Sequence, residues 1–304
     1  MSKFLQFELW KNCNVGCKFC FNRYQPTSDT KYKLIALDNM LNVLQSDEVE
    51  DFDELGFIGG EFFSGQIDTE EVRSKFYQGI DIVIDRMKQD KVYKFYIATS
   101  LIYDLNTEFN YFLQKFIDAK VLKRLMISTS YDIEGRFKTH REEQLWQMNM
   151  IGLHEKYPML PIHTQIVLSQ NFIRHVLDNS FNIEEFCKKY YTFVDYNIPH
   201  IGYDYRDKEE FNKLIPDFLP KRDDFLKFLH KTVIEDKTVD IDKLFDYKTK
   251  ADVMYLIYIN TIYRIINKNY KTLLPFGLYD KAGYADSDIK IWEDVAKFKE
   301  ELDE

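Results

Sequence analysis

The chain has 304 residues, of which 45% are apolar, enough to bury a substantial core in one large domain or two of ordinary size. Its 41 basic and 50 acidic residues give a formal net charge of −9, which disfavours an extended surface for nucleic acid or anionic lipid. The apolar run 253–259 is far shorter than the roughly 20 residues of a spanning helix, and Glu8 and Lys11 interrupt any early signal-peptide pattern. We therefore expect a cytoplasmic protein without a membrane segment.

Six β-rich runs, each followed by a helical pattern, alternate along residues 1–205. They are Phe4–Trp10, Glu54–Gly60, Tyr93–Ser100, Leu122–Ser130, Pro161–Leu168 and Thr192–Pro199. This alternation predicts an α/β fold built from parallel β/α units.

The helical pattern after the second run has its apolar residues on one face, at Val72, Phe76, Ile80, Val83 and Met87. Asp68 and Glu71 have the spacing of a capping pair, so we expect this helix to begin at Asp68. Residues 206–304 show helical runs without further β/α alternation. They are predicted to be a mainly helical extension packed on residues 1–205.

Three of the four cysteines, Cys13, Cys17 and Cys20, lie together directly after the first β-rich run. Clustered thiols of this kind indicate metal binding rather than a disulfide framework. The fourth, Cys187, lies in a helical pattern, where a single cysteine is usually a small buried apolar residue.

The spacing C-x3-C-x2-C, with the aromatic Phe19 just before the last cysteine, resembles the cluster motif of the radical S-adenosylmethionine (radical SAM) superfamily. The resemblance implies a [4Fe-4S] cluster held by three thiolates, with one iron open to S-adenosylmethionine. It implies that an electron from the cluster cleaves this cofactor to a 5′-deoxyadenosyl radical, and that reduced flavodoxin or ferredoxin supplies the electron. The family typically has a partial (β/α)6 TIM-like barrel, and residues 1–205 match it in their six units.

Gly59, Gly60 and Glu61 follow the second β-rich run and resemble the Gly-Gly-Glu motif of the family. Glycines at a strand end let backbone carbonyls approach a ligand, here the ammonium group of the cofactor. Glu61 would add a compensating charge. The alternative for this segment is a tight turn.

The fourth run ends at Ser128 and Ser130, whose hydroxyls are expected to bind the ribose of the cofactor, as relatives of this family place polar residues there. Arg136 and Arg141 follow, and the resemblance makes them candidates for the methionyl carboxylate, with Arg141 chosen as a cofactor residue. The alternative for each arginine is a solvated charge at a helix start.

The fifth run carries His163, Gln165 and Ser169 on one face, a polar stripe that suggests a barrel interior made for a polar ligand. Gln165 is a candidate cofactor residue, and the alternative is a satisfied network in the core. Beyond the sixth run, His200 and Tyr203 are expected at the barrel mouth as catalytic residues that position substrate or move a proton.

Two other functions compete with a radical enzyme. A structural zinc module normally needs a second pair of ligands, and no such Cys/His pair appears at suitable spacing. An iron–sulfur sensor or electron carrier normally supplies a fourth cysteine and does not need a barrel. The substrate, a peptide or a small molecule, and the reaction subclass (oxidoreductase, isomerase or transferase chemistry) are left open by the sequence, because one fold hosts many reactions.

Overall fold

A computed structural model describes residues 4–10, 12–17, 20, 30–105, 108–133, 135–197, 221, 224, 227, 228, 231 and 270–273. Six strands alternate with helices through residue 197, and they run parallel to one another. The strands are β1 (Phe4–Glu8), β2 (Glu54–Ile58), β3 (Lys94–Ala98), β4 (Leu125–Tyr131), β5 (Ile162–Val167) and β6 (Phe193–Asn197). Five of the six predicted runs contain one of these strands and the fourth, Leu122–Ser130, overlaps β4, so the predicted α/β alternation is confirmed.

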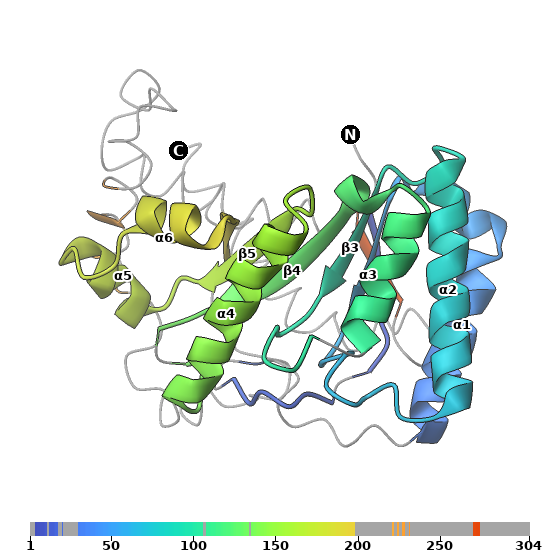
Figure 1. Ribbon diagram of the computed structural model, residues 1–304, viewed down its shortest axis with the longest axis horizontal. Helices are drawn as coiled ribbons and strands as arrows, with labels where there is room; N and C mark the ends of the chain where they lie inside the picture. Colours follow the sequence, from blue (N-terminus) through green and yellow to red (C-terminus); the bar gives the residue numbers. More distant parts are fainter. Residues whose placement is uncertain are drawn as a thin grey trace, which may run out of the picture.

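The sheet has the strand order β6-β5-β4-β3-β2-β1-β7, so the first six strands lie side by side in their sequence order (Figure 1). Sequential parallel strands joined by helices are the arrangement of a partial (β/α) barrel. The seventh strand, β7 (Tyr270–Leu273), pairs with β1 in parallel. It lies in the predicted helical extension, where the sequence analysis marked no strand.

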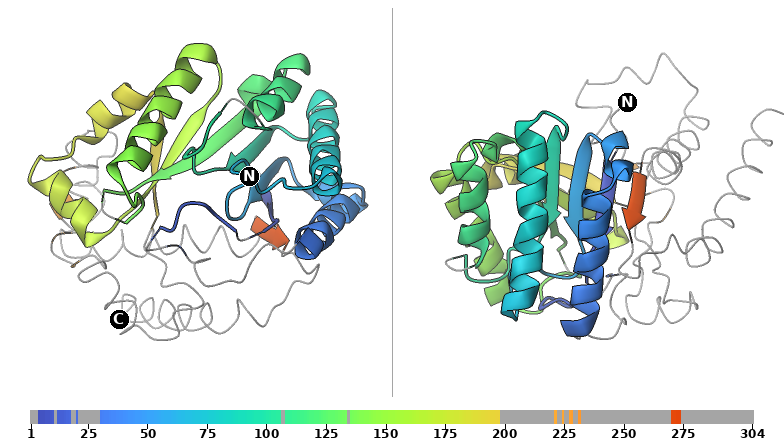
Figure 2. Two further views of the ribbon diagram at one scale, coloured as in Figure 1. Left: turned by 60° about the horizontal axis from the view of Figure 1, so that its bottom comes forward. Right: turned by 90° about the vertical axis from the view of Figure 1, so that its right-hand side faces the viewer.

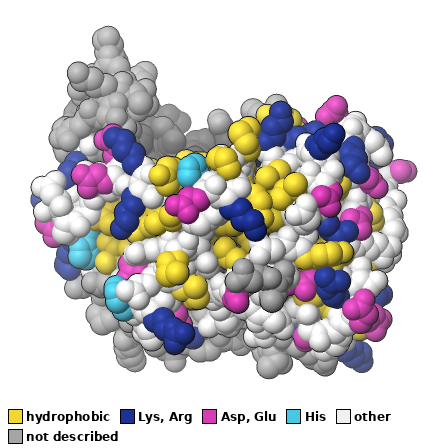
Figure 3. Space-filling view, viewed as in Figure 1, with side chains coloured by type: hydrophobic (Ala, Val, Ile, Leu, Met, Phe, Trp, Pro, Cys, Tyr) yellow, Lys and Arg dark blue, Asp and Glu magenta, His cyan; other side chains and the backbone are white. Residues whose placement is uncertain are grey.

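The helices are α1 (Thr30–Leu44), α2 (Glu70–Lys88), α3 (Glu108–Asp118), α4 (His140–Lys156), α5 (Gln170–Leu177) and α6 (Ile183–Tyr190), with two short 3-10 turns, η1 (Asp47–Asp51) and η2 (Leu122–Arg124). The two views of Figure 2 place α1 to α4 on one face of the sheet. Figure 3 shows basic and acidic side chains interspersed over this side of the molecule, which therefore has mixed charge. None of the helices in the described residues is long and apolar enough to cross a membrane.

The core lies between the sheet and these helices, and it is strongly aromatic. The five predicted apolar positions of α2, from Val72 to Met87, are all buried. The ring of Phe57 on β2 packs edge-to-face against Phe95 on β3 at 4.9 Å and contacts Phe76 on α2 at 6.1 Å. Such rings bury large apolar areas, which fixes the helices against the strands.

Asp68 and Ser169, which lie just before helices, have roles other than those predicted. Thr69, not Asp68, caps α2, and its hydroxyl accepts a hydrogen bond from the Val72 amide at 3.2 Å. Asp68 instead forms an ion pair of 2.8 Å with buried Lys33, so the predicted capping pair is wrong. Ser169 caps α5 in the same way as Thr69 caps α2, by accepting from the Phe172 amide, and this takes it out of the polar stripe predicted for the fifth run.

We call the sheet face opposite the helices the inner face. Gly56 on β2 belongs to it, and a Cβ there would stand 2.6 Å from the Phe4 ring and 2.9 Å from the Tyr96 ring. The absence of this Cβ lets Phe4 and Tyr96 meet edge-to-face across β2 at 6.0 Å. His163 and Gln165 alternate onto this face of β5, as predicted.

Lys221, Asp224 and Phe228 of the C-terminal part contact α5. Phe228 is buried and packs on Phe172 at 6.0 Å, and the Gln170 amide group bonds both Asp224 and the Lys221 backbone. The boundary at residue 205 and the helical character predicted for the rest of 206–304 lie outside the described residues and stay predictions.

Candidate functional site

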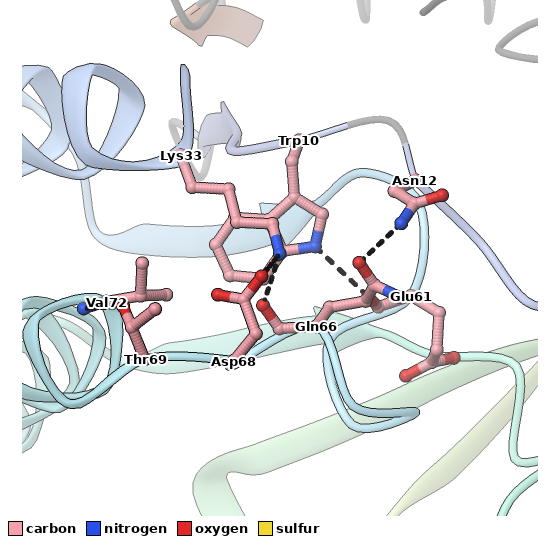
Figure 4. A network of polar contacts seen from close by, with 8 residues as sticks. All are labelled: Trp10, Asn12, Lys33, Glu61, Gln66, Asp68, Thr69 and Val72. Carbon is pink, nitrogen blue, oxygen red and sulfur yellow. Dashed lines mark hydrogen bonds and ion pairs between the residues drawn. The ribbon is translucent and has the colours of Figure 1, made fainter. Parts of the chain in front are cut away.

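The cysteine loop, Asn12–Cys17 with Cys20, leaves the carboxyl end of β1 beside the turn that follows β2. Trp10 anchors this junction, because its ring is fully buried against Phe62 at 5.0 Å and its indole N–H donates to the Glu61 carbonyl at 3.0 Å (Figure 4). The Gly60 amide in turn donates to the Trp10 carbonyl at 2.6 Å. The entry to the loop is thus fixed by backbone and ring contacts that involve no thiol.

Two asparagines tie the loop to neighbouring turns. The Asn12 side-chain amide donates to Gln66 Oε1 at 2.6 Å (Figure 4). The Asn12 carbonyl accepts from the Glu61 amide at 2.7 Å. Asn14 Nδ2 donates to the Ile102 carbonyl at 2.8 Å. The loop is therefore held by the segments that follow both β2 and β3.

The segment after β4 adds two cations. Lys138 Nζ donates to the Asn14 carbonyl at 3.4 Å, and Arg136 Nη1 lies 3.8 Å from Cys17 Sγ in hydrogen-bond geometry. Within the loop, the Cys20 amide donates to the Cys17 carbonyl at 3.1 Å. Residues that follow three different strands therefore converge on the loop.

Gly59 and Gly60 form the turn after β2, and the structure gives Gly59 a clear steric role. A Cβ at Gly59 would lie 2.2 Å from the Trp10 carbonyl oxygen. The space left by its missing side chain is filled by the backbone at the end of β1. Gly59 thus brings the turn and the cysteine loop together, a role that the sequence analysis did not foresee.

Glu61 is completely buried, and its carboxylate accepts hydrogen bonds from protein groups. The donors are the Phe63 amide at 2.9 Å, the Thr99 hydroxyl at 2.9 and 3.0 Å, and the Ser100 amide. Burial raises the pKa of Glu61, and these bonds oppose that rise. The carboxylate thus links the turn after β2 to the end of β3.

The three thiols of the loop influence one another. Although Cys13 is exposed, desolvation by surrounding protein raises its pKa to about 12, with smaller contributions in the same direction from Glu61, Cys17 and Cys20. Burial also raises the pKa of Cys17, whereas the Arg136 cation lowers it. These effects place the three sulfurs in one electrostatic neighbourhood.

The donor set fits a thiolate-bound metal or iron–sulfur cluster, because three thiols from one loop are the ligands that such a group requires. In the described part of the chain, no three His, Cys, Asp or Glu side chains stand in a ready-made ion site. Metal binding would have to displace the thiol protons, as it does in other thiolate sites. Backbone and amide contacts hold the loop, and its three sulfurs would be the ligands of the metal group.

The predicted cofactor residues on β4 and β5 lie together on the inner face. Ser130 pairs with Gln165, and Ser128 with His163, between β4 and β5. Ser128 is buried with its hydroxyl 3.5 Å from His163 Nδ1, and Gln165 Nε2 donates to the Tyr96 hydroxyl at 3.4 Å. A polar stripe thus crosses β3, β4 and β5 and reaches the cysteine loop through Arg136, which donates to Ser130 Oγ at 2.8 Å.

The two predicted arginines differ in their surroundings. Arg136 is only 5% exposed, whereas Arg141 is exposed in the first turn of α4. The Asp132 carboxylate accepts from the Gly135 amide and so bends the chain after β4, which brings Arg136 back over the strand end. Among the described residues, no contact joins Arg141 to the cysteine loop. The Asp-x-x-Gly pattern was the signal for this turn.

Three predicted site residues, Phe19, His200 and Tyr203, lie outside the described residues and stay predictions.

Cys187 lies on α6, partly exposed and packed against the core, where burial raises its pKa.

Comparison with family models gives no match, and comparison with curated proteins gives none either. Among solved structures, the chain is similar to Streptococcus suis SuiB bound to S-adenosylmethionine, with a TM-score of 0.44 and 13% identity over 90% of this chain and 50% of that one. SuiB bound to the precursor peptide SuiA gives a TM-score of 0.39 and 14% identity over 90% and 49% of the two chains. The chain thus spans about half the length of these structures.

Proposed function

We propose that the chain is a radical SAM enzyme in which Cys13, Cys17 and Cys20 hold a [4Fe-4S] cluster. When bound, the cluster supplies the electron that cleaves S-adenosylmethionine to a 5′-deoxyadenosyl radical, which takes hydrogen from a peptide or small-molecule substrate. The observation that carries this proposal is the position of the cysteine loop, held at the carboxyl ends of β1 to β4. Parallel β/α folds place their chemistry at this edge.

The residues around the loop supply groups suited to the cofactor. Arg136 is the better placed of the two arginines for the methionyl carboxylate, because it is buried beside Cys17, and its Nε has no hydrogen-bond partner among the described residues. A buried N–H without a partner is a donor available to an acceptor. Gly60, Ser128 and Gln165 stay proposed cofactor residues.

Glu61 is proposed to support the site without contacting the cofactor. Its carboxylate accepts from Ser100 and Phe63, so it would hold the turn that carries Gly60 rather than reach the cofactor itself. The inner-face stripe, with His163 buried on it, supports a polar substrate or polar cofactor atoms in the barrel interior. We also propose reduced flavodoxin or ferredoxin as the electron donor, in the cytoplasm.

Anaerobic reconstitution tests the metal. The protein should bind about four irons and four sulfides, and Cys13→Ala, Cys17→Ala or Cys20→Ala should lose them. Cys187→Ala is the matched control, because it removes a thiol outside the loop and should retain the cluster. Stoichiometric zinc in protein purified without oxygen, with no broad visible absorption, would contradict the proposal and favour a zinc-binding module.

Cofactor cleavage tests the reaction. After reduction with dithionite or a flavodoxin system, the reconstituted protein should convert S-adenosylmethionine into methionine and 5′-deoxyadenosine, slowly without substrate and faster with it. Deuterium from a labelled substrate should appear in the 5′-deoxyadenosine. An intact, reduced cluster that yields no 5′-deoxyadenosine would point to a non-catalytic iron–sulfur protein, such as a sensor or an electron carrier.

A further inference from the structure

Arg136 connects the cysteine loop to the interior of the sheet. Nη1 donates to Ser130 Oγ at 2.8 Å and lies 3.8 Å from Cys17 Sγ, and Nη2 donates to the Ser100 carbonyl at 2.9 Å. The side chain is only 5% exposed. Its guanidinium is therefore held in one orientation by β4 and by the end of β3, with one edge directed at a single sulfur of the loop.

Burying a cation is costly unless nearby groups stabilise its charge. The Ser130 hydroxyl and the Ser100 carbonyl are neutral acceptors, whereas Cys17 becomes anionic when it binds metal. Asp132, on the same turn as Arg136, is also buried, and its carboxylate accepts a hydrogen bond from the Gly135 amide. The turn beside Cys17 thus carries two buried groups of opposite charge, the Arg136 guanidinium that contacts the sulfur and the Asp132 carboxylate.

We propose that Arg136 is a positioning residue that acts through Cys17: its guanidinium holds the sulfur and raises the reduction potential of the cluster, while Asp132 lowers that potential. The inference rests on the proposed function. Reduction adds one negative charge to the cluster, so a nearby cation favours the reduced state and a nearby anion disfavours it. Hydrogen bonds to the sulfurs and local charge are known determinants of cluster potentials, and burial strengthens both.

Lys138 does not compete with Arg136 for this role. It is exposed and contacts the backbone of Asn14 rather than a sulfur, so solvent and salt screen its charge. Ser130 acts on Cys17 only through Arg136, because its hydroxyl orients the guanidinium. Removing that hydroxyl should weaken the effect of Arg136 on Cys17 without removing the charge.

A redox titration of the reconstituted protein, followed by electron paramagnetic resonance without S-adenosylmethionine, tests the inference. Arg136→Gln should lower the reduction equilibrium constant about tenfold, which for one electron is ~59 mV. Asp132→Asn should shift the potential in the opposite direction, because it keeps an acceptor for the Gly135 amide but loses the charge. Arg136→Lys, which keeps the charge, should recover part of the shift. Arg174→Gln, which changes an exposed arginine on α5 in the same way, should match wild type.

Iron content is measured on every variant. If Arg136→Gln assembles no cluster, Ser130→Ala decides the question, because it should shift the potential in the direction expected for Arg136→Gln, by a smaller amount. The inference is overturned if Arg136→Gln holds full iron and has the potential of Arg174→Gln. If Arg136→Gln assembles no cluster, the same result for Ser130→Ala overturns it. It also fails if Arg136→Gln and Asp132→Asn shift the potential in the same direction. Wild-type protein that assembles no cluster would overturn the proposed function, an outcome distinct from an unchanged potential.

Discussion

The buried carboxylate of Glu61 gives the sharpest stability prediction, because two backbone amides and one hydroxyl donate hydrogen bonds to it. Glu61→Ala would leave two buried backbone amides, those of Phe63 and Ser100, without the acceptor they have now. Each unsatisfied buried group costs about 1–3 kcal/mol, so the variant should lose about 2–6 kcal/mol of unfolding free energy. The Thr99 hydroxyl loses an acceptor too, but it keeps its contact with the Tyr103 hydroxyl at 2.6 Å.

Urea unfolding of the metal-free protein measures this loss. Glu61→Gln keeps one acceptor oxygen and should lose less, about 1–3 kcal/mol. Glu71→Ala is the control, since Glu71 is exposed in the first turn of α2 and its removal should stay within about 0.5 kcal/mol of wild type. If Glu61→Ala unfolds at the same urea concentration as Glu71→Ala with an unchanged slope, the carboxylate does not hold these amides and the reasoning fails.

Three further predictions concern the same turn. Gly60→Val should retain the cluster but weaken S-adenosylmethionine binding in calorimetry, and equal affinities would remove Gly60 from the cofactor site. Gly59→Ala should lose about 1–3 kcal/mol of unfolding free energy through its clash with the Trp10 carbonyl, whereas Gly152→Ala, in open space on α4, should gain about 0.5–1 kcal/mol. Because burial raises the folded-state pKa of Glu61, its contribution to stability is fully present below the ordinary value of 4.5 and is lost as pH rises through the folded value. Glu61→Gln should therefore flatten the fall of unfolding free energy with rising pH in that window, and an unchanged slope would contradict the assignment.

The fold was largely predictable because its signal is local. Each of the six strands is a short run rich in apolar or β-branched residues, and right-handed β/α crossovers place successive strands side by side. The strand β7 was not predictable in this way. Tyr270–Leu273 is only four residues long, and its position depends on pairing with β1 at the far end of the chain. The start of β4 was placed too early, because Leu122–Arg124 form a 3-10 turn in which Arg124 bonds the Met87 and Tyr93 carbonyls.

The site was predictable where spacing carries the chemistry and unpredictable where burial does. The cysteine spacing and the Gly-Gly-Glu segment identify the loop and the turn that the structure places in contact. By contrast, Arg136 and Arg141 look alike in sequence. The Asp132 turn together with Ser100, which follows β3, buries the first and not the second. Likewise, a glutamate after two glycines does not reveal that Thr99 and Ser100 will enclose it.

The contacts of the loop also separate two kinds of thiol-bound metal site. In a structural zinc module the metal supplies the folding energy, so the metal-free chain is unfolded. Here Asn12, Asn14 and Trp10 fix the loop through backbone and amide contacts that do not involve a thiol. Burial meanwhile raises the pKa of Cys13 and Cys17, which favours their neutral thiol forms. A loop fixed by contacts that involve no thiol belongs to a scaffold that presents a metal group rather than one that depends on the metal for folding.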